Sequence, residues 1–477
     1  MNDVLKNNPK NNPKNDLKIG NSSVRLIRGR FLHFLEDPFS KVDSSVDSNL
    51  ESKSYQYVKH GIMLIVDGFI QEFLDCADPK HQQRIADLNE FKGFKDIPTT
   101  HYPSSHLIVP GFIDTHIHYP QTEIIASYGE QLLEWLNKYT FPTESKFADA
   151  AYAEQVANFF IEELLRNGTT TAAILGTVHK HSVDAVFAAA QQRKMRVIAG
   201  KVLMDRTGFT PDSLYESAAQ GYEESKKLIQ KWHGKERLSY AVTPRFAITS
   251  TEEQLRLSGK LMQEFPGVYM QTHLAENLKE VETVDSLYLR SAGYAGYLDV
   301  YDHFGLLGDK SIFAHCVHLR EGELERLAAS NSVISFCPSS NLFLGSGLFP
   351  FQQSVVRMGL GTDVGGGSTF SLLKTMHDAY KTAQLQHKKL SAFGSFYLAT
   401  LGGARALSLD HLIGNFLPGK EADFVVLNPA VTPLQQFRLD AIKNLELHDE
   451  LFGMVALGDE RSVVATYVMG KNVKHDD

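Results

Sequence analysis

Short apolar segments alternate with longer amphipathic segments through the middle of this chain, and this alternation restricts the possible folds more than any other feature. Segments with helical periodicity, such as Ala151–Arg166, Ser213–Trp232, Thr251–Glu264 and Gly322–Ser330, lie between most of the apolar segments. Eight apolar segments are predicted to be strands, namely Leu107–His118, Thr169–Leu175, Arg196–Met204, Leu238–Phe246, Val268–Glu276, Ser311–His318, Val333–Cys337 and Met358–Asp363.

Eight β–α units in succession predict a closed parallel (βα)8 barrel of the TIM type, an α/β fold with its active groups at the carboxyl ends of the strands. The alternative is an open, doubly wound sheet. That fold commonly places a glycine-rich phosphate loop after an early strand, and we find no such loop here.

Both ends of the chain differ from the middle and are rich in residues that favour β-strands. The segments 24–27, 62–68, 422–427 and 463–471 are predicted strands bounded by Gly, Asp and Pro. They could meet as one small β-sandwich domain built from both termini. We therefore predict a disordered Asn-, Lys- and Pro-rich tail over 1–21, a composite sandwich from 22–106 and 412–477, and a catalytic barrel over 107–411. The polar stretch Glu36–Lys59 has the composition of a surface loop.

Composition narrows the class of function. The 477 residues are 43% hydrophobic and 22% charged, with a net charge of −8 and no apolar stretch of membrane length. This balance predicts a soluble globular protein with no membrane or nucleic-acid partner, since phosphate binding needs a clustered excess of Lys and Arg. The three cysteines, Cys76, Cys316 and Cys337, are far apart and predict a reduced, cytoplasmic setting without a signal peptide.

Two histidines separated by one residue, His116 and His118, lie at the end of the first predicted strand. Residues i and i+2 of a strand point to the same face, so both imidazoles can approach one point. An isolated pair of this kind could equally be hydrogen-bonded or solvated. The interpretation as part of a metal site depends on what the other strand ends supply.

Further ionisable residues follow at the ends of later strands. His273 and Glu276 end the fifth predicted strand, His315 lies in the sixth, and Asp363 ends the eighth. Taken singly, each could be an ordinary core, cap or turn residue. Together, they would cost several kcal/mol apiece to bury without partners. Three imidazoles and a carboxylate suit Zn²⁺, and Fe²⁺ would also fit. Such an ion lowers the pKa of bound water from ~15.7 to about 7, which points to metal-assisted hydrolysis.

These residues resemble the metal-binding pattern of a known family. The segment Pro110–His118 together with His273, His315 and Gly361–Asp363 is similar to the pattern of the amidohydrolase superfamily, and the similarity runs from about residue 62 to 470. Within that superfamily, the members that deaminate guanine share further similar segments, namely His118–Gln121, Leu133–Pro142, Thr243–Phe246, His273–Asn277 and Cys337–Asn341.

The resemblance implies one zinc per chain, held by His116, His118, His273 and Asp363. It implies that Glu276 shuttles protons, that Asp363 also accepts the proton of the water, and that His315 polarises the attacking water or the tetrahedral centre. The residues placed around the purine are Gln121, Arg245, Phe246, His273 and Trp135. Core packing is the strongest alternative for Trp135. Since the fourth strand ends in Arg245 and not in a bridging lysine, one metal is expected.

The resemblance also implies a homodimer that converts guanine to xanthine and ammonia in purine catabolism. Two alternatives stay open at this point. The chain could be another aminohydrolase or chlorohydrolase of the superfamily, acting on a pyrimidine, triazine or adenosine-like substrate. It could also be a catalytically inactive barrel scaffold. The preference among guanine, oxidised guanines and pterins is not determined by the sequence.

Overall fold

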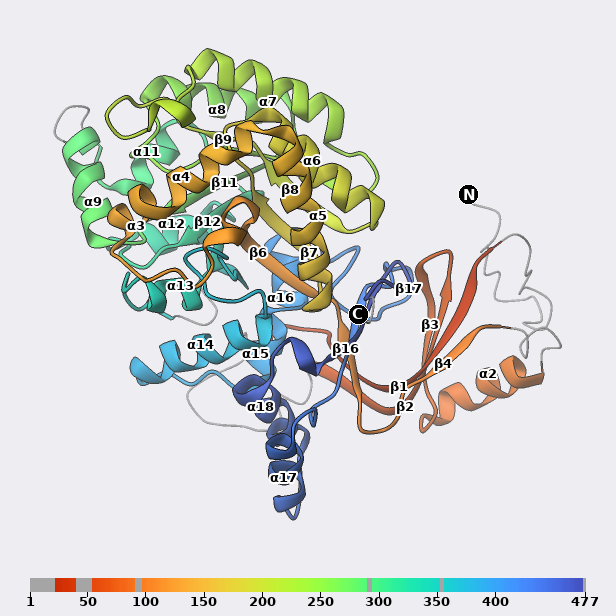
Figure 1. The fold of residues 1–477 in the computed structure, drawn as a ribbon. Coiled ribbons are helices and arrows are strands. Elements are labelled where there is room, and N and C mark those ends of the chain that lie inside the picture. Colours follow the sequence, from red (N-terminus) through yellow and green to blue (C-terminus); the bar gives the residue numbers. More distant parts are fainter. Residues whose placement is uncertain (1–21, 40–53, 91–96, 290–293, 352–355, 475–477) are drawn as a thin grey trace.

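The computed structural model describes residues 22–39, 54–90, 97–289, 294–351 and 356–474. The predicted tail over 1–21 and residues 40–53 of the predicted surface loop lie outside the described residues. In Figure 1, a helix-covered body formed by the middle of the chain lies beside a β-rich body in which the two ends of the chain meet. Among the described residues, no helix combines the length and apolar character needed to cross a bilayer.

The first body is the predicted barrel. Its strands are parallel and lie side by side in the order β14-β13-β12-β11-β10-β8-β7-β6, with the short β9 (Val202–Leu203) paired to β10. The (βα)8 prediction is therefore confirmed. The bounds are β6 Phe112–His118, β7 Thr169–Leu175, β8 Arg196–Gly200, β10 Leu238–Pro244, β11 Tyr269–Leu274, β12 Ser311–His315, β13 Val333–Phe336 and β14 Arg357–Leu360.

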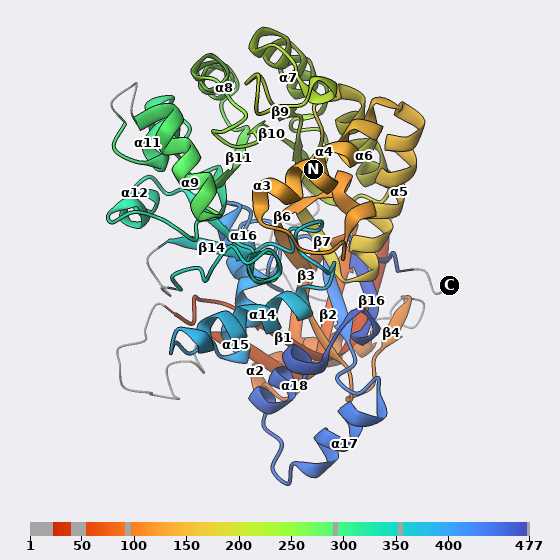
Figure 2. The ribbon, with the colours of Figure 1, turned by 60° about the vertical axis from the view of Figure 1, so that its left-hand side comes forward.

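Helices cover the outside of the barrel, as Figure 2 shows for α5 to α8. Their apolar faces pack against the strands, and polar residues such as Asp149 and Thr251 cap their first turns. The helices of this layer are α5 Ala150–Arg166, α6 Lys180–Gln192, α7 Ala218–Trp232, α8 Glu252–Glu264, α9 Leu278–Val284, α11 Tyr297–His303, α12 Glu323–Ala329, α13 Pro338–Phe343, α14 Leu372–Leu385, α15 Ala392–Leu398 and α16 Leu401–Ala406. Short single turns occur at η6 Asp212–Leu214, η7 Asp285–Leu289 and η8 Glu460–Ser462.

The connection between β6 and β7 is longer than a simple barrel loop. It contains five consecutive short helical pieces that cross the carboxyl end of the barrel, and we call this segment the cap. The pieces are η3 Tyr119–Ile124, α3 Leu132–Trp135, η4 Leu136–Thr140, α4 Phe141–Ser145 and η5 Lys146–Ala148. The cap therefore brings residues of the early chain over the strand ends.

The second body is one sheet with strand order β17-β16-β15-β5-β1-β2-β3, and β4 is added to β1. Apolar residues from both ends of the chain, including Ile27, Met63, Phe424 and Tyr467, share one core. The predicted joining of the two termini is confirmed. The bounds are β1 Val24–Phe34, β2 Tyr55–Val66, β3 Phe69–Asp75, β4 Thr99–His101, β5 Leu107–Pro110, β15 Phe424–Leu427, β16 Val463–Val468 and β17 Lys471–Asn472.

Several parts of the chain differ from the prediction. The segment Leu107–His118 forms two strands, because β5 pairs with β1 and β15 in the terminal sheet before the chain enters the barrel as β6. Residues 55–59 belong to β2 and pair with β1, although their polar composition predicted a loop. The C-terminal part also contains two helices that the sequence did not predict, α17 Pro433–Ala441 and α18 Leu447–Leu457, while α2 Pro79–Glu90 packs on the N-terminal strands.

The barrel closes through side chains at one seam. No backbone ladder joins β6 to β14 in the described pairings; instead, Thr115 Oγ1 donates to the Leu360 carbonyl at 3.0 Å. The buried Asp114 carboxylate accepts from Thr362 N at 3.1 Å and from Thr362 Oγ1 at 2.5 Å. A backbone bond of 3.0 Å from Asp363 N to the His116 carbonyl continues the seam. The first and last strands of the barrel are thereby held together.

Buried charges join the two bodies beneath the barrel. Arg237 Nη2 lies 2.7 Å from Glu421 Oε2 and also pairs with Asp423, and Arg196 pairs with the other oxygen of Glu421. All four side chains are buried. Arg196 and Arg237 come from the start of β8 and from just before β10, whereas the carboxylates lead into β15. This cluster fixes the floor of the barrel to the terminal sheet.

Replacing Glu421 by alanine is expected to lower the free energy of unfolding by about 3–5 kcal/mol, because it leaves two buried guanidinium groups without their shared carboxylate. Denaturant unfolding followed by circular dichroism measures this change. Arg256→Ala, which breaks an exposed pair with Glu253, is the control and should leave the unfolding midpoint unchanged. Equal midpoints for the two variants would contradict the assignment of the cluster as a structural anchor.

Candidate active site

The two histidines of β6 converge with an aspartate on one point. His116 Nε2 and His118 Nε2 each lie 3.3 Å from Asp363 Oδ1, and all three side chains are buried. Asp363 lies three residues beyond the end of β14, so the seam that closes the barrel also places this carboxylate beside the histidines. His273 at the end of β11 completes the group. One ligand atom from each of the four lies within 4.8 Å of all the others.

The nitrogen atoms of this group are in the state that metal binding requires. His273 Nδ1 lies 2.8 Å from the Arg245 carbonyl, so this nitrogen carries the proton and Nε2 presents its lone pair. That Nε2 lies only 3.1 Å from His118 Nε2, and the buried His116 Nε2 has no hydrogen-bond partner in the described structure. Burial lowers the pKa of all three imidazoles, which keeps them neutral.

Asp363 supplies the negative charge. Burial alone would raise its pKa, but the close contact with His116 and the charge of His315 outweigh burial and hold the pKa of Asp363 below its ordinary range. Three neutral imidazoles and an ionised carboxylate fit one divalent transition metal with a position left open. The structure thus brings together the four ligands named from the sequence.

Several residues around this group adopt strained backbone conformations. Positive φ angles between 49° and 71° occur at four residues, namely Ala275, His315, Cys316 and Asp363. Non-glycine residues rarely adopt this region, and such strain concentrates where a precise side-chain position is required. All four lie at or just beyond the carboxyl ends of barrel strands.

A second acid and a fourth histidine lie next to the ligand group. Glu276 Oε2 is 3.4 Å from His315 Nε2, and burial raises the pKa of Glu276 to about 7. Burial acts to lower the pKa of His315, but the carboxylates of Glu276 and Asp363 outweigh it, so this pKa is raised. His315 therefore differs from the three neutral imidazoles. Its Nδ1 contacts Asn341 Oδ1 at 2.8 Å, which orients the ring.

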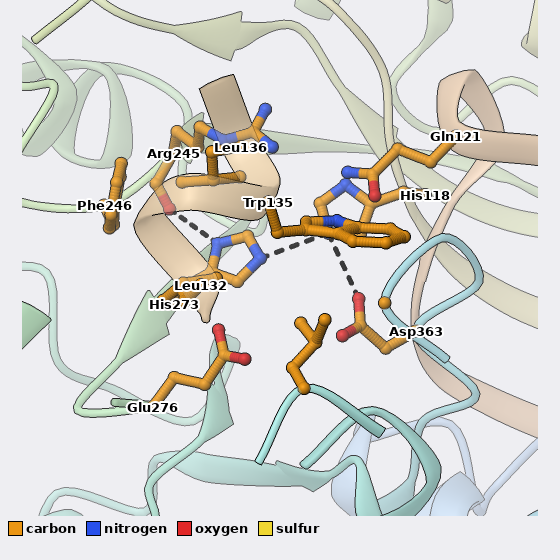
Figure 3. Close-up of a pocket in the computed structure, with 12 residues that line it drawn as sticks. His118, Gln121, Leu132, Trp135, Leu136, Arg245, Phe246, His273, Glu276 and Asp363 are labelled. Carbon is orange, nitrogen blue, oxygen red and sulfur yellow. Dashed lines mark hydrogen bonds and ion pairs between the residues drawn. The ribbon is translucent and has the colours of Figure 1, made fainter. Parts of the chain in front are cut away.

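A pocket opens directly above these groups. Figure 3 shows the Trp135 ring over the ligand group, with Gln121 and Arg245 on one side and Glu276 on the other. Phe246 and three leucines supply the apolar lining. The five residues predicted around a purine, including His273 and Trp135, all line this pocket.

Gly365 makes room for one polar group of the pocket. Its φ is +118°, and a β-carbon added there would lie 2.1 Å from Gln121 Oε1. A side chain at position 365 would therefore displace the Gln121 amide. This explains why the residue two positions after Asp363 is a glycine.

Three polar contacts of the site were not predicted. Asn341 orients His315, Ser346 Oγ donates to Glu276 Oε1 at 3.0 Å, and Glu144 contacts both Arg245 and Gln121. Asn341 falls in the segment Cys337–Asn341, which resembles the family, so the sequence contained a motif that could have indicated it. Ser346 and Glu144 lie in a loop and in a short cap helix, where the sequence has no periodicity that indicates burial.

The purified chain is expected to contain about one transition-metal ion, and His118→Ala should remove most of it because one ligand of the four is lost. Elemental analysis of dialysed protein measures the content. His181→Ala is the control, since His181 instead contacts the Phe147 carbonyl. Equal metal content in the two variants would show that the group does not hold the ion.

Comparison with known proteins agrees with this geometry. The pattern of the amidohydrolase family matches residues 107–473. The chain is 49% identical over 458 residues to a guanine deaminase of Escherichia coli (strain K12), and the match covers 95% of this chain and 98% of that protein.

Solved structures are also similar. The guanine deaminase from Bradyrhizobium japonicum is 35% identical, with a TM-score of 0.86, and the match covers 95% of this chain and 100% of that one. The guanine deaminase from C. acetobutylicum, with guanine bound in its active site, is 28% identical, with a TM-score of 0.79 and coverage of 94% and 99%. The chain therefore belongs to the amidohydrolase family, and within that family to the guanine deaminases.

Proposed function

We propose that this chain catalyses the hydrolytic deamination of guanine, in which guanine and water give xanthine and ammonia. One observation carries the proposal: a single buried pocket joins the four-ligand group and the acid Glu276 to a guanidinium and an amide that can hydrogen-bond a purine. The 49% identity to the guanine deaminase of E. coli and the similarity to a structure with guanine bound support it. Intact ligands and acids argue against an inactive scaffold.

Zinc is the proposed cofactor, one ion per chain, held by His116, His118, His273 and Asp363. Nitrogen-rich sites with one carboxylate suit this borderline-soft ion, and elemental analysis distinguishes it from iron. When bound, the metal would supply an activated water for attack on C2 of guanine.

The proton steps are assigned to the chain's own acids. Asp363 accepts the proton that the water gives up. Glu276 donates a proton to the ring nitrogen beside C2, then takes the proton of the hydroxyl group added at C2 and passes it to the amine, which leaves as ammonia as the C2 carbonyl forms. The proton held by Asp363 returns to Glu276 and restores both groups. A carboxyl group with a pKa near 7 can both donate and accept at neutral pH, and this is the value that burial gives Glu276. His315 polarises the water or the tetrahedral centre with a raised pKa that favours its charged form.

Substrate recognition is assigned to the pocket wall. Arg245 donates to the C6 carbonyl of guanine, and Gln121 hydrogen-bonds the adjacent ring edge. Phe246 and Trp135 contact the ring faces, and His273 lies beside the reacting carbon. Trp135 is 2% exposed and packs against Tyr139, so it serves both core and pocket.

The setting of the enzyme is also proposed. The three cysteines are free, and two of them are buried beside the site, which suits a reducing cytoplasm. A homodimer and a role in purine catabolism follow from the resemblance to the guanine deaminases.

Guanine should release ammonia at a kcat/KM at least about 10³-fold above that of adenine. In adenine, the C6 amine would face the Arg245 guanidinium as a donor against a donor, and a site built to hydrogen-bond one group rejects an analogue that lacks it. A coupled ammonia assay with both purines and a panel of oxidised guanines and pterins measures this. Faster turnover of adenine than of guanine would overturn the substrate assignment.

Glu276→Gln should lower kcat for guanine by about 10²–10⁴-fold, because an amide cannot transfer the proton. Steady-state kinetics should show this loss while metal content stays at the wild-type level. Glu253→Gln on the exposed face of α8 is the control and should keep full activity. Unchanged turnover in Glu276→Gln would show that another group moves the proton.

A further inference from the structure

A fully buried carboxylate of the cap lies outside the metal-ligand group and has no part in the proton steps. Glu144, at the end of α4, has an exposed fraction of 0%. Burying a carboxylate is costly unless charged or polar partners satisfy it. The role of Glu144 can therefore be inferred from its hydrogen-bond partners.

Both partners are side chains of the substrate pocket. Arg245 Nη1 donates to the two oxygens of Glu144 at 2.9 and 2.8 Å. Gln121 Nε2 donates to Glu144 Oε1 at 3.3 Å. Arg245 and Gln121 are themselves 2% and 4% exposed. One carboxylate thus connects the two groups that face the same side of the pocket.

A carboxylate can only accept hydrogen bonds, and this restricts both partners. Gln121 has to turn its amide NH₂ toward Glu144, which leaves its carbonyl oxygen for the pocket. Figure 3 shows the Gln121 nitrogen directed toward Arg245 and the oxygen directed away from it. Among the described residues, this oxygen accepts no hydrogen bond. Arg245 commits Nη1 to Glu144 and keeps its other N–H groups as donors.

We propose that Glu144 is a positioning residue that sets the order of donor and acceptor with which Arg245 and Gln121 recognise the lactam edge of guanine. In that order, Arg245 donates to the C6 carbonyl oxygen and the Gln121 oxygen accepts the N1–H. The inference rests on the proposed function, since it assumes that this edge of the purine faces these two residues.

The donor of Arg245 and the acceptor of Gln121 match the C6 and N1 edge of guanine and oppose the same edge of 2-aminopurine. Guanine presents an acceptor at C6 and a donor at N1. 2-Aminopurine carries the same reactive C2 amine but has C6–H and an unprotonated N1, so N1 would face the Gln121 oxygen as acceptor against acceptor. The ratio of kcat/KM for guanine to that for 2-aminopurine therefore measures the order directly.

Glu144→Gln tests the inference. The new amide would accept from Arg245 with its oxygen and donate to Gln121 with its NH₂, so Gln121 would reverse and present NH₂ to N1–H. We expect kcat/KM for guanine to fall about 10²-fold and that for 2-aminopurine to stay level or rise, because guanine loses a matched hydrogen bond at N1 whereas 2-aminopurine gains one. A purely structural role would lower both by the same factor and leave the ratio unchanged, which would overturn the inference.

Two further variants complete the experiment. Glu216→Gln removes another buried carboxylate, which pairs with the buried Lys201 outside the pocket, and it should keep the wild-type ratio. The double variant Glu144→Gln with Gln121→Glu restores an acceptor-only group facing N1–H. Its ratio of kcat/KM for guanine to that for 2-aminopurine should be at least about tenfold higher than the ratio of Glu144→Gln. This double variant also keeps complementary partners, so it decides the question if the single variant does not fold.

The outcomes separate this inference from the proposed function. A wild-type chain that deaminates neither purine would refute the function itself. An active wild type with an unchanged ratio in Glu144→Gln, or a double variant that folds without recovering the ratio, would refute the role of Glu144 alone.

Discussion

The seam between β6 and β14 is the contact on which the active site depends. These strands are the first and last of the barrel, and side chains instead of a backbone ladder join them. Asp114 bonds Thr362, and Thr115 bonds the Leu360 carbonyl, so the two strand ends are fixed in register. His116 and His118 therefore meet Asp363, although more than two hundred residues separate them in the chain. A barrel left open at this seam would have no metal-ligand group.

Burial then divides the polar groups at the strand ends into different chemical states. The three imidazoles that face one another become neutral because burial and mutual repulsion disfavour their charge. His315 lies between two carboxylates and keeps a raised pKa, while Glu276 is shifted to about 7. Side chains of the same type thus take different charge states according to their neighbours. Pairs of groups whose pKa values are shifted in opposite directions are typical of acid–base sites.

The cap adds recognition to this chemistry. It begins directly after His118, and its first turn carries Gln121, while its fourth helical piece carries Glu144. Arg245 follows β10 directly and pairs with Glu144. The proposed metal ligands and the proposed substrate contacts are therefore linked through one short length of chain and one ion pair. Beneath the barrel, the cluster of Arg196, Arg237 and the two carboxylates anchors the opposite end to the terminal sheet.

Periodicity in the sequence was sufficient for the barrel and for the joined termini, and the resemblance to the amidohydrolase superfamily named His116, His118, His273 and Asp363 as a group. These features are local, since each depends on a strand pattern or on residues close together in the chain. Prediction failed where the answer depended on distant partners. The polar residues 55–59 became a strand only because β1 pairs with them, and β5 left the barrel because the terminal sheet accepted it. Glu144 and Asp114 appear ordinary in sequence, and only the tertiary structure decided their roles. It buries Glu144 against Arg245, about 100 positions away, in the wall of the pocket. It buries Asp114 against Thr362, about 250 positions away, where the two residues close the barrel.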